Sequence, residues 1–131
     1  MKSSVVDTNI LSDLFRGEPS VRGFLSEFES IYVPVTVLGE LLFGFVLGSR
    51  EMENRRRLDQ FLSQRSVEIL PVSPSVAEHY ASVMASLRRN GTPLPTNDVW
   101  IAATACAEKV PLISRDRHFS KINGLQLIVP E

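Results

Sequence analysis

Four acidic residues of this chain stand beside or inside apolar segments, where a carboxylate is hardest to accommodate: Asp7, Glu40, Asp98 and Asp116. Burying an unpaired carboxylate is costly, and like charges held close together raise one another's pKa. A divalent cation shared by the four side chains would relieve both penalties. Because no Cys or His joins the set, the hard ions Mg²⁺ or Mn²⁺ fit better than Zn²⁺. The four acids are therefore candidates for metal binding and for catalysis.

Three of these acids also have a purely structural interpretation. Asp7 and Asp98 could be N-caps of helices, and Asp116 could be a turn residue. Glu40 is harder to explain in this way, because it is the only charged residue within residues 31–49. The apolar residues around it leave almost no polar face on an amphipathic helix. This favours a functional role for Glu40.

Short apolar runs alternate with longer amphipathic ones, which predicts alternating strands and helices. Strands are predicted at residues 3–6, 31–33, 67–72, 111–114 and 125–129. Helices are predicted near residues 11–15, 21–28, 37–42, 51–63, 74–90 and 97–109. The resulting order β-α-α-β-α-α-β-α-α-β-β predicts one α/β domain over residues 1–131, with a mostly parallel central sheet of about five strands flanked by helices.

Local signals also suggest where three of the helices begin. Ser73 followed by Pro74 is a typical helix start, and Gly91 would end that helix. Thr36 is the predicted N-cap of the helix that carries Glu40. Either Thr96 or Asn97 is the predicted N-cap of the helix that carries Asp98.

Parallel sheets bind ligands outside the carboxyl ends of their strands. Asp7 and Asp116 follow the predicted first and fourth strands. Asp98 falls in the first turn of its helix, where free N–H groups and the helix dipole favour a negative charge. Glu40 falls in the second turn of its helix. We therefore expect the four acids to meet at one edge of the sheet.

Four segments in this order resemble the motif set of the PIN-domain ribonucleases, among them the VapC toxins of toxin–antitoxin pairs. The matching segments are residues 5–9 with Leu11, the helix-borne Glu40, residues 97–103 and residues 114–119. The resemblance extends over essentially the whole chain. It implies that the four acids bind one or two Mg²⁺ or Mn²⁺ ions. Thr8 and Asn9 would support the pocket as neutral polar groups, although Asn9 could instead cap the first helix.

The resemblance implies a metal-dependent endoribonuclease that acts as the toxin of such a pair. The ion would lower the pKa of a water molecule and neutralise charge on the scissile phosphate, and Asp98 or Asp116 would take the proton. The expected partners are an RNA substrate, a cognate antitoxin protein and a second copy of the chain. Residues 35–47 and 99–107 are more apolar than one small core needs, which favours a homodimer.

Arginines flank one of the predicted metal ligands. Arg115 and Arg117 stand on either side of Asp116 and are candidate contacts for RNA phosphates. His118 follows closely and is a weaker candidate for substrate contact. Arg55, Arg56 and Arg57 cannot share one helix face, so a solvated helix surface explains them better.

Bulk properties place few further limits on function. The chain has 131 residues, a formal net charge of −1 and one cysteine, Cys106, so it forms no intrachain disulfide. Its most apolar stretch, residues 41–47, is far shorter than the ~20 residues that span a bilayer, and its start is charged too early for a signal peptide. We expect a soluble, cytoplasmic protein with no membrane partner.

Two alternatives compete with the nuclease interpretation. A phosphatase that uses Asp7 as its nucleophile would need a second Asp two residues later, where this chain has Asn9. A non-catalytic PIN-like binding module would keep the acidic pocket to receive a basic residue of a partner. The sequence disfavours the first alternative and leaves the second open.

Overall fold

Five parallel strands form the centre of the computed structural model, which describes residues 2–131. The sheet has the order β3-β2-β1-β4-β5. The strands are β1 (Ser3–Val6), β2 (Ser30–Pro34), β3 (Val67–Leu70), β4 (Leu112–Ile113) and β5 (Leu127–Ile128). All five predicted strands are thus confirmed, and every pairing is parallel rather than most of them.

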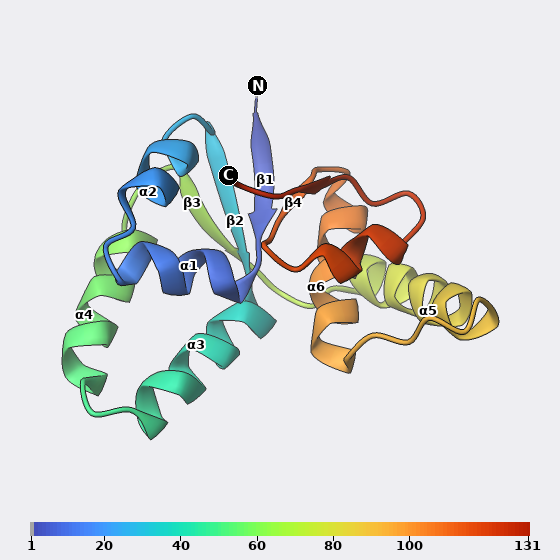
Figure 1. Cartoon of the computed structure of the whole chain (residues 1–131), viewed down its shortest axis with the longest axis horizontal. Coiled ribbons are helices and arrows are strands. Elements are labelled where there is room, and N and C mark those ends of the chain that lie inside the picture. The colour runs from blue at the N-terminus through green and yellow to red at the C-terminus, as the bar shows by residue number, and fades with distance from the viewer. Residues whose placement is uncertain (1) are drawn as a thin grey trace.

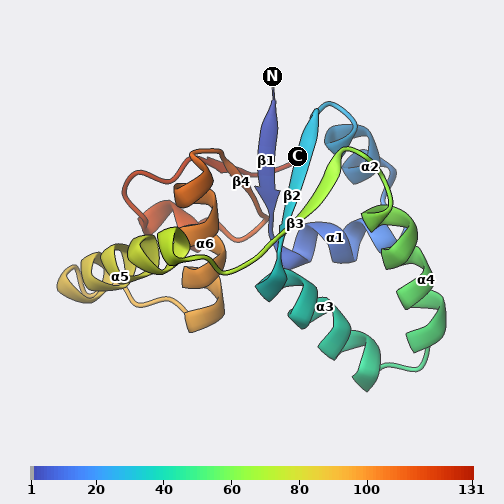
Figure 2. The ribbon, with the colours of Figure 1, turned by 180° about the vertical axis from the view of Figure 1, so that it is seen from behind.

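Six α-helices flank the sheet at the predicted places in the chain. They are α1 (Thr8–Phe15), α2 (Pro19–Leu25), α3 (Val35–Leu47), α4 (Glu51–Leu62), α5 (Pro74–Arg89) and α6 (Thr96–Glu108), with a short 3-10 helix, η1 (Arg117–Lys121). In Figure 1, α1 to α4 lie to the left of β1, and α5 and α6 lie to its right. Figure 2, seen from behind, shows that α3 runs downward from the lower end of the sheet and that α4 runs back up toward β3. The predicted α/β fold is confirmed.

The predicted helix starts are correct at one position and wrong at two. The Ser73 hydroxyl accepts a hydrogen bond from the backbone N–H of Val76, so the predicted cap of α5 is confirmed. None of Thr36, Thr96 and Asn97 is a cap, because α3 begins directly after Pro34 and α6 directly after Pro95. Both prolines have extended backbone angles, near φ −59° and ψ 143° at Pro34. The fixed φ of proline leads the chain into the helix without a capping side chain.

The core lies on both faces of β1, the central strand. Val5 and Val6 are fully buried, as are Leu112 and Ile113 on β4. The small residues of α6 contribute to this core, since Ala102, Ala103 and Ala105 are also fully buried. The expectation that residues 99–107 would be left over for a dimer interface is therefore wrong for this helix, whose apolar side chains are mostly used inside the monomer.

In contrast to α6, α3 leaves apolar side chains at the surface. Only Val37, Leu41 and Phe45 of this helix are buried, whereas Phe43 is 65% and Leu47 is 73% exposed. Within residues 2–131, every helix is too short or too polar to span a lipid bilayer.

Candidate active site

The four predicted acids meet at the carboxyl edge of the sheet. Asp7 directly follows β1, and Asp116 lies just beyond the neighbouring strand β4. Asp98 is in the first turn of α6, and Glu40 is in the second turn of α3. The charges of Asp7, Asp116 and Glu40 all act on Asp98 and raise its pKa. The structure therefore brings together all four residues that the sequence selects.

The acids share this edge without forming a closed ligand cage. Among the described residues, no group of three or more His, Cys, Asp or Glu side chains is arranged to hold a metal ion. Three of the acids are instead hydrogen-bonded to neighbours. Glu40 Oε1 accepts from the Thr8 hydroxyl at 2.7 Å, and Asp116 Oδ1 lies 2.8 Å from Nδ1 of His118.

Asp7 is the most buried of the four acids and the best supported by hydrogen bonds. It is 5% exposed, and its Oδ1 accepts a hydrogen bond from the backbone N–H of the next residue, Thr8, at 2.8 Å. Its Oδ2 accepts from the Ser114 hydroxyl at 2.6 Å and from the Asn9 amide at 3.3 Å. Burial nevertheless raises the pKa of Asp7, with a further contribution from Glu40 and Asp116. Asp7 is thus the N-cap of α1 as well as a site residue.

Asp98 has the most strongly shifted pKa of the site. Burial of this half-buried carboxyl is the main cause, followed by the charges of Asp7, Asp116 and Glu40, and the pKa rises from its ordinary 3.8 to about 6. The charge of His118 acts in the opposite direction but does not outweigh these causes. A carboxyl with this pKa can take up and release a proton near neutral pH.

Ser114 is a site residue to which sequence reasoning gave no role. It is fully buried at the end of β4, and its hydroxyl donates to Asp7. The same oxygen accepts from the backbone N–H of Asp116 at 3.0 Å and from the Asn9 amide at 3.3 Å. Ser114 therefore links two of the acids directly. The available signal was a lone hydroxyl between a buried apolar strand and Asp116.

Asn9 does not cap the first helix, because Asp7 has that role. Its amide donates to Asp7 and Ser114, and its Oδ1 accepts from the backbone N–H of Arg115 at 3.2 Å. Thr8 meanwhile holds Glu40. Both neutral polar residues lie in the site and contact the acids.

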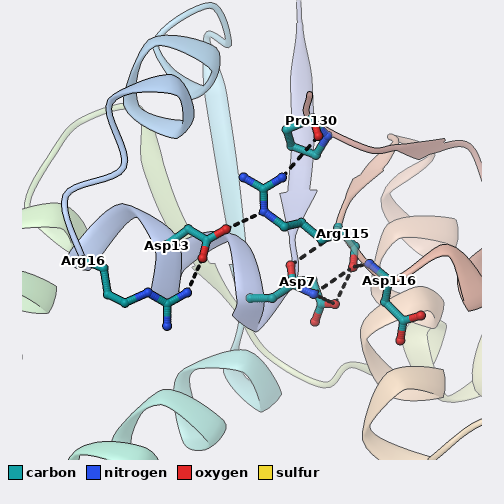
Figure 3. A network of polar contacts seen from close by, with 8 residues as sticks. Asp7, Asp13, Arg16, Arg115, Asp116 and Pro130 are labelled. Carbon is teal, nitrogen blue, oxygen red and sulfur yellow. Dashed lines mark hydrogen bonds and ion pairs between the residues drawn. The ribbon is translucent and has the colours of Figure 1, made fainter.

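The two arginines beside Asp116 differ in what they contact. Arg117 is exposed at the start of η1. The guanidinium of Arg115 instead turns away from the acids and pairs with Asp13, while its Nη1 donates to the carbonyl of Pro130 at 3.2 Å (Figure 3). Asp13 was missed by sequence reasoning, although it stands one helical turn after Asn9, on the same face of α1.

The triplet Arg55, Arg56 and Arg57 lies on exposed positions of α4, away from the candidate site. Arg55 pairs with Glu51 and Arg57 with Glu53, each at 2.9 Å and one helical turn apart. Such exposed i,i+4 pairs are typical of a solvated helix surface. This confirms the structural interpretation of the triplet.

Comparison with known proteins agrees with the fold. Residues 4–125 match the PIN domain. The chain is 30% identical to VapC ribonuclease Y4jK of Sinorhizobium fredii, with 96% of each chain covered. It is 31% identical to ribonuclease VapC4 of Mycobacterium tuberculosis over 73% of this chain and 74% of that protein. Its fold is similar to the crystal structure of VapBC2 from Rickettsia felis bound to a promoter DNA fragment, with a TM-score of 0.90, 26% identity, and coverage of 98% and 99% of the two chains.

A parallel α/β sheet of this kind is thus the fold of a PIN domain, and this chain belongs to the PIN domain family. Relatives that span almost its whole length place it among the VapC proteins of that family.

Proposed function

We propose that this protein is a Mg²⁺- or Mn²⁺-dependent endoribonuclease and the toxin of a toxin–antitoxin pair. The observation that carries this proposal is the convergence of four carboxylates, of which one is 5% exposed and another has a pKa raised to about 6. Relatives named as ribonucleases support the same activity.

The residues at this edge fit a hard divalent cation. Their donors are carboxylate oxygens, which Mg²⁺ and Mn²⁺ prefer. The raised pKa values of Asp7 and Asp98 reflect burial and mutual repulsion, which a bound cation would oppose. Asp7, Glu40, Asp98 and Asp116 would hold the ion, so Glu40 would turn from Thr8 and Asp116 from His118.

When bound, the ion would lower the pKa of a water molecule and neutralise charge on the scissile phosphate. The chain supplies the remaining functions. Asp98 accepts the proton from the attacking water, because the bound cation would oppose the raised pKa of this residue and keep it as a carboxylate, the form that takes up a proton. Ser114 and Asn9 hold Asp7 in one orientation. Arg117, exposed beside the site, contacts a phosphate of the RNA. The products carry a 5′-phosphate and a 3′-hydroxyl.

The decisive experiment compares RNA cleavage by the wild type, Asp98→Asn and Asp59→Asn with Mn²⁺ or EDTA. Asp59 lies on the exposed surface of α4 and is the matched control. We expect Asp98→Asn to fold normally and to lose about 100-fold in kcat, since loss of general base catalysis costs this much. Asp59→Asn should cleave like the wild type, and EDTA should abolish cleavage. Unchanged turnover in Asp98→Asn would remove this residue from the mechanism.

We infer that the exposed apolar face of α3 is covered by a second copy of the chain. Phe43 and Leu47 at the end of α3 and Met52 at the start of α4 are each at least 65% exposed, with Val46 beside them at 57%. Apolar side chains gathered in this way are typical of protein interfaces. Light scattering at micromolar concentration should give twice the 14.6 kDa mass of the chain. The monomer mass would contradict the dimer.

The antitoxin is expected to restrain the nuclease by placing an Arg or Lys against the four carboxylates, where a guanidinium pairs well. Such a cation competes with the metal, so inhibition should weaken as Mn²⁺ rises. Expression of the chain alone should arrest growth, and co-expression with its antitoxin should rescue it. An active nuclease that causes no arrest would contradict the toxin role. Antitoxin binding without RNA cleavage by the free protein would instead favour a non-catalytic binding module.

A further inference from the structure

Arg115 belongs to the loop that carries the site residues, yet its side chain leaves the site. Its Nε donates to Oδ2 of Asp13 on α1, and its Nη1 donates to the carbonyl of Pro130 at 3.2 Å. Its backbone N–H donates to Oδ1 of Asn9 at 3.2 Å. Figure 3 shows the guanidinium pointing away from the carboxylate of Asp116. Arg115 is therefore fixed to α1 at two points, through its main chain and its side chain.

Asp13 receives two guanidinium groups on one carboxylate. Arg16 contacts Oδ1 and Arg115 contacts Oδ2, while the Asp13 side chain is 12% exposed. Burial alone would raise the pKa of Asp13, but the hydrogen bonds from Arg115 and Arg16 outweigh burial and lower it. The two pairs differ in reach. Arg16 is three residues away on the chain, whereas Arg115 is 102 residues away and joins α1 to the loop after β4.

We propose that the Arg115–Asp13 ion pair is a positioning device that sets Ser114 and Asp116 in place relative to Asp7, an inference that rests on the proposed nuclease function. Ser114 and Asp116 are the immediate chain neighbours of Arg115, and Ser114 donates to Asp7 at 2.6 Å. A shift of Arg115 therefore moves a hydrogen-bond donor of one acid and the backbone of another. The pair gives Arg115 a different role from the phosphate contact predicted for it.

Small displacements at such a site have large kinetic effects. A misplacement of about 1 Å can cost ~100-fold in rate, because the reacting groups no longer meet in a productive geometry. Loss of the guanidinium also leaves Pro130 without its donor and Asp13 with Arg16 alone. The expected signature is a loss in kcat with little change in KM.

The test measures kcat and KM for a quenched fluorescent RNA with Mn²⁺ at several salt concentrations. We expect Arg115→Ala to lower kcat about 10- to 100-fold with unchanged KM and salt dependence. Arg115→Lys, which keeps a cation near Asp13, should recover part of that loss. Arg16→Ala is the first control, since it removes the other partner of Asp13 without touching the loop, and it should leave kcat within about twofold. Arg117→Ala is the second, and it should raise KM.

Two kinetic outcomes would overturn the proposal. If Arg115→Ala raises KM and reduces the slope of log KM against log salt by about 1 while kcat holds, Arg115 contacts a phosphate instead. If Arg16→Ala loses as much kcat as Arg115→Ala, the ion pairs only stabilise α1. Should Arg115→Ala fail to fold, Asp13→Asn removes the charge of the same pair with a nearly isosteric side chain and is measured in its place.

Calorimetric titration with Mn²⁺ separates this proposal from the nuclease assignment. Arg115→Ala and Asp13→Asn should each weaken Mn²⁺ binding about fivefold or more by displacing Asp116, and Arg16→Ala should not. A wild type that binds Mn²⁺ but cleaves no RNA would refute the proposed function. The role of the Arg115–Asp13 pair would then be decided by the Mn²⁺ affinities of the variants alone. Equal affinities in all four proteins would overturn the positioning role, and a wild type that binds no Mn²⁺ would overturn both proposals.

Discussion

The pKa values of Asp7 and Asp98 are both raised by burial, but the other groups around each carboxyl act differently. Asp7 is almost wholly buried, yet hydrogen bonds from Ser114 and Thr8 oppose the effect of burial on its pKa. At Asp98, burial and three neighbouring acids act in the same direction, and its pKa reaches about 6. Of the two, Asp98 is the better suited to exchange protons near neutral pH, whereas Asp7 is the better fixed.

The stability of the metal-free protein should therefore fall between about pH 4 and pH 7. Below the unfolded pKa of 3.8, Asp98 is protonated in both states and its contribution is nil. Between 3.8 and about 6 the folded protein keeps a proton that the unfolded chain has lost, so the free energy of unfolding decreases as pH rises. Above about 6 the full penalty of the charged form is present.

Melting temperatures in EDTA across this range measure the effect, and Asp98→Asn isolates it from the opposite contribution of Asp13, whose pKa is lowered. The melting temperature of the variant should decline less steeply with pH than that of the wild type. Part of the decline should remain, because the pKa of Asp7 is also raised. Parallel curves for the two proteins would show that Asp98 carries no such shift.

Ser114→Ala should destabilise the protein through a single lost hydroxyl. The substitution removes a donor to buried Asp7 and the acceptor of the Asp116 N–H. Leaving buried polar groups unsatisfied costs about 1–3 kcal/mol. Denaturant unfolding should register this loss, with Ser63→Ala, an exposed serine on α4's C-cap, changing the free energy of unfolding by less than about 0.5 kcal/mol. Equal effects of the two substitutions would contradict the linking role of Ser114.

At the scale of elements, the site depends on where α3 and α6 begin. Both start directly after a proline, which places Glu40 in the second turn and Asp98 in the first. Neither helix uses a side-chain cap, and the Thr36 hydroxyl is buried without a hydrogen-bond partner among the described residues. The positions of these two acids thus follow from backbone geometry at Pro34 and Pro95.

The other end of α6 is less favourable. Lys109, its C-cap, has a φ of 58°, the only non-glycine positive φ among residues 2–131. Left-handed backbone costs an L-residue roughly 1–2 kcal/mol, which glycine avoids. Glycine also gives the unfolded chain more conformational entropy, which offsets part of this gain. Lys109→Gly should therefore raise the free energy of unfolding by up to about 1 kcal/mol.

Thermal or denaturant unfolding checks this prediction, and Asn90→Gly provides the matched control. Asn90 is the C-cap of α5 with an ordinary φ of −86°, so glycine there brings only the entropic cost and should destabilise. Destabilisation by both substitutions would show that the side chain of Lys109 outweighs its backbone strain.

At the scale of the whole molecule, the parallel sheet gathers acids that are far apart in the chain. Because β1 and β4 are neighbours, Asp7 and Asp116 reach the same edge, and α3 and α6 deliver the other two acids there. The fold thus concentrates negative charge before any ligand binds.

Millimolar Mn²⁺ should consequently raise the melting temperature, because a ligand that binds only the folded state stabilises it by mass action. Asp116→Asn should reduce this response and, by lessening repulsion on Asp7 and Asp98, raise the melting temperature in EDTA. Differential scanning fluorimetry with and without Mn²⁺ measures both effects. A melting curve insensitive to Mn²⁺ would contradict a shared site.

The sequence by itself determined the element order and the position of each of the four acids within its element. Short apolar runs define β1 and β4, so Asp7 and Asp116 could be placed at strand ends, and the polar residues before Val99 placed Asp98 at a helix start. These features arise from hydrophobic periodicity and backbone preferences, which act over a few neighbouring residues. Because these features have a local origin, they can be predicted from a single sequence. The predicted starts of α3 and α6 are accordingly only one or two residues from Pro34 and Pro95.

Tertiary structure alone decided which side chains meet. The Ser114–Asp7 hydrogen bond and the Arg115–Asp13 ion pair join residues more than 100 positions apart. It also decided that α6 is buried while α3, of similar apolar composition, is partly exposed. Hydrogen bonds, ion pairs and pKa shifts depend on distance and burial in the folded chain, and both quantities exist only once the sheet has brought distant segments together.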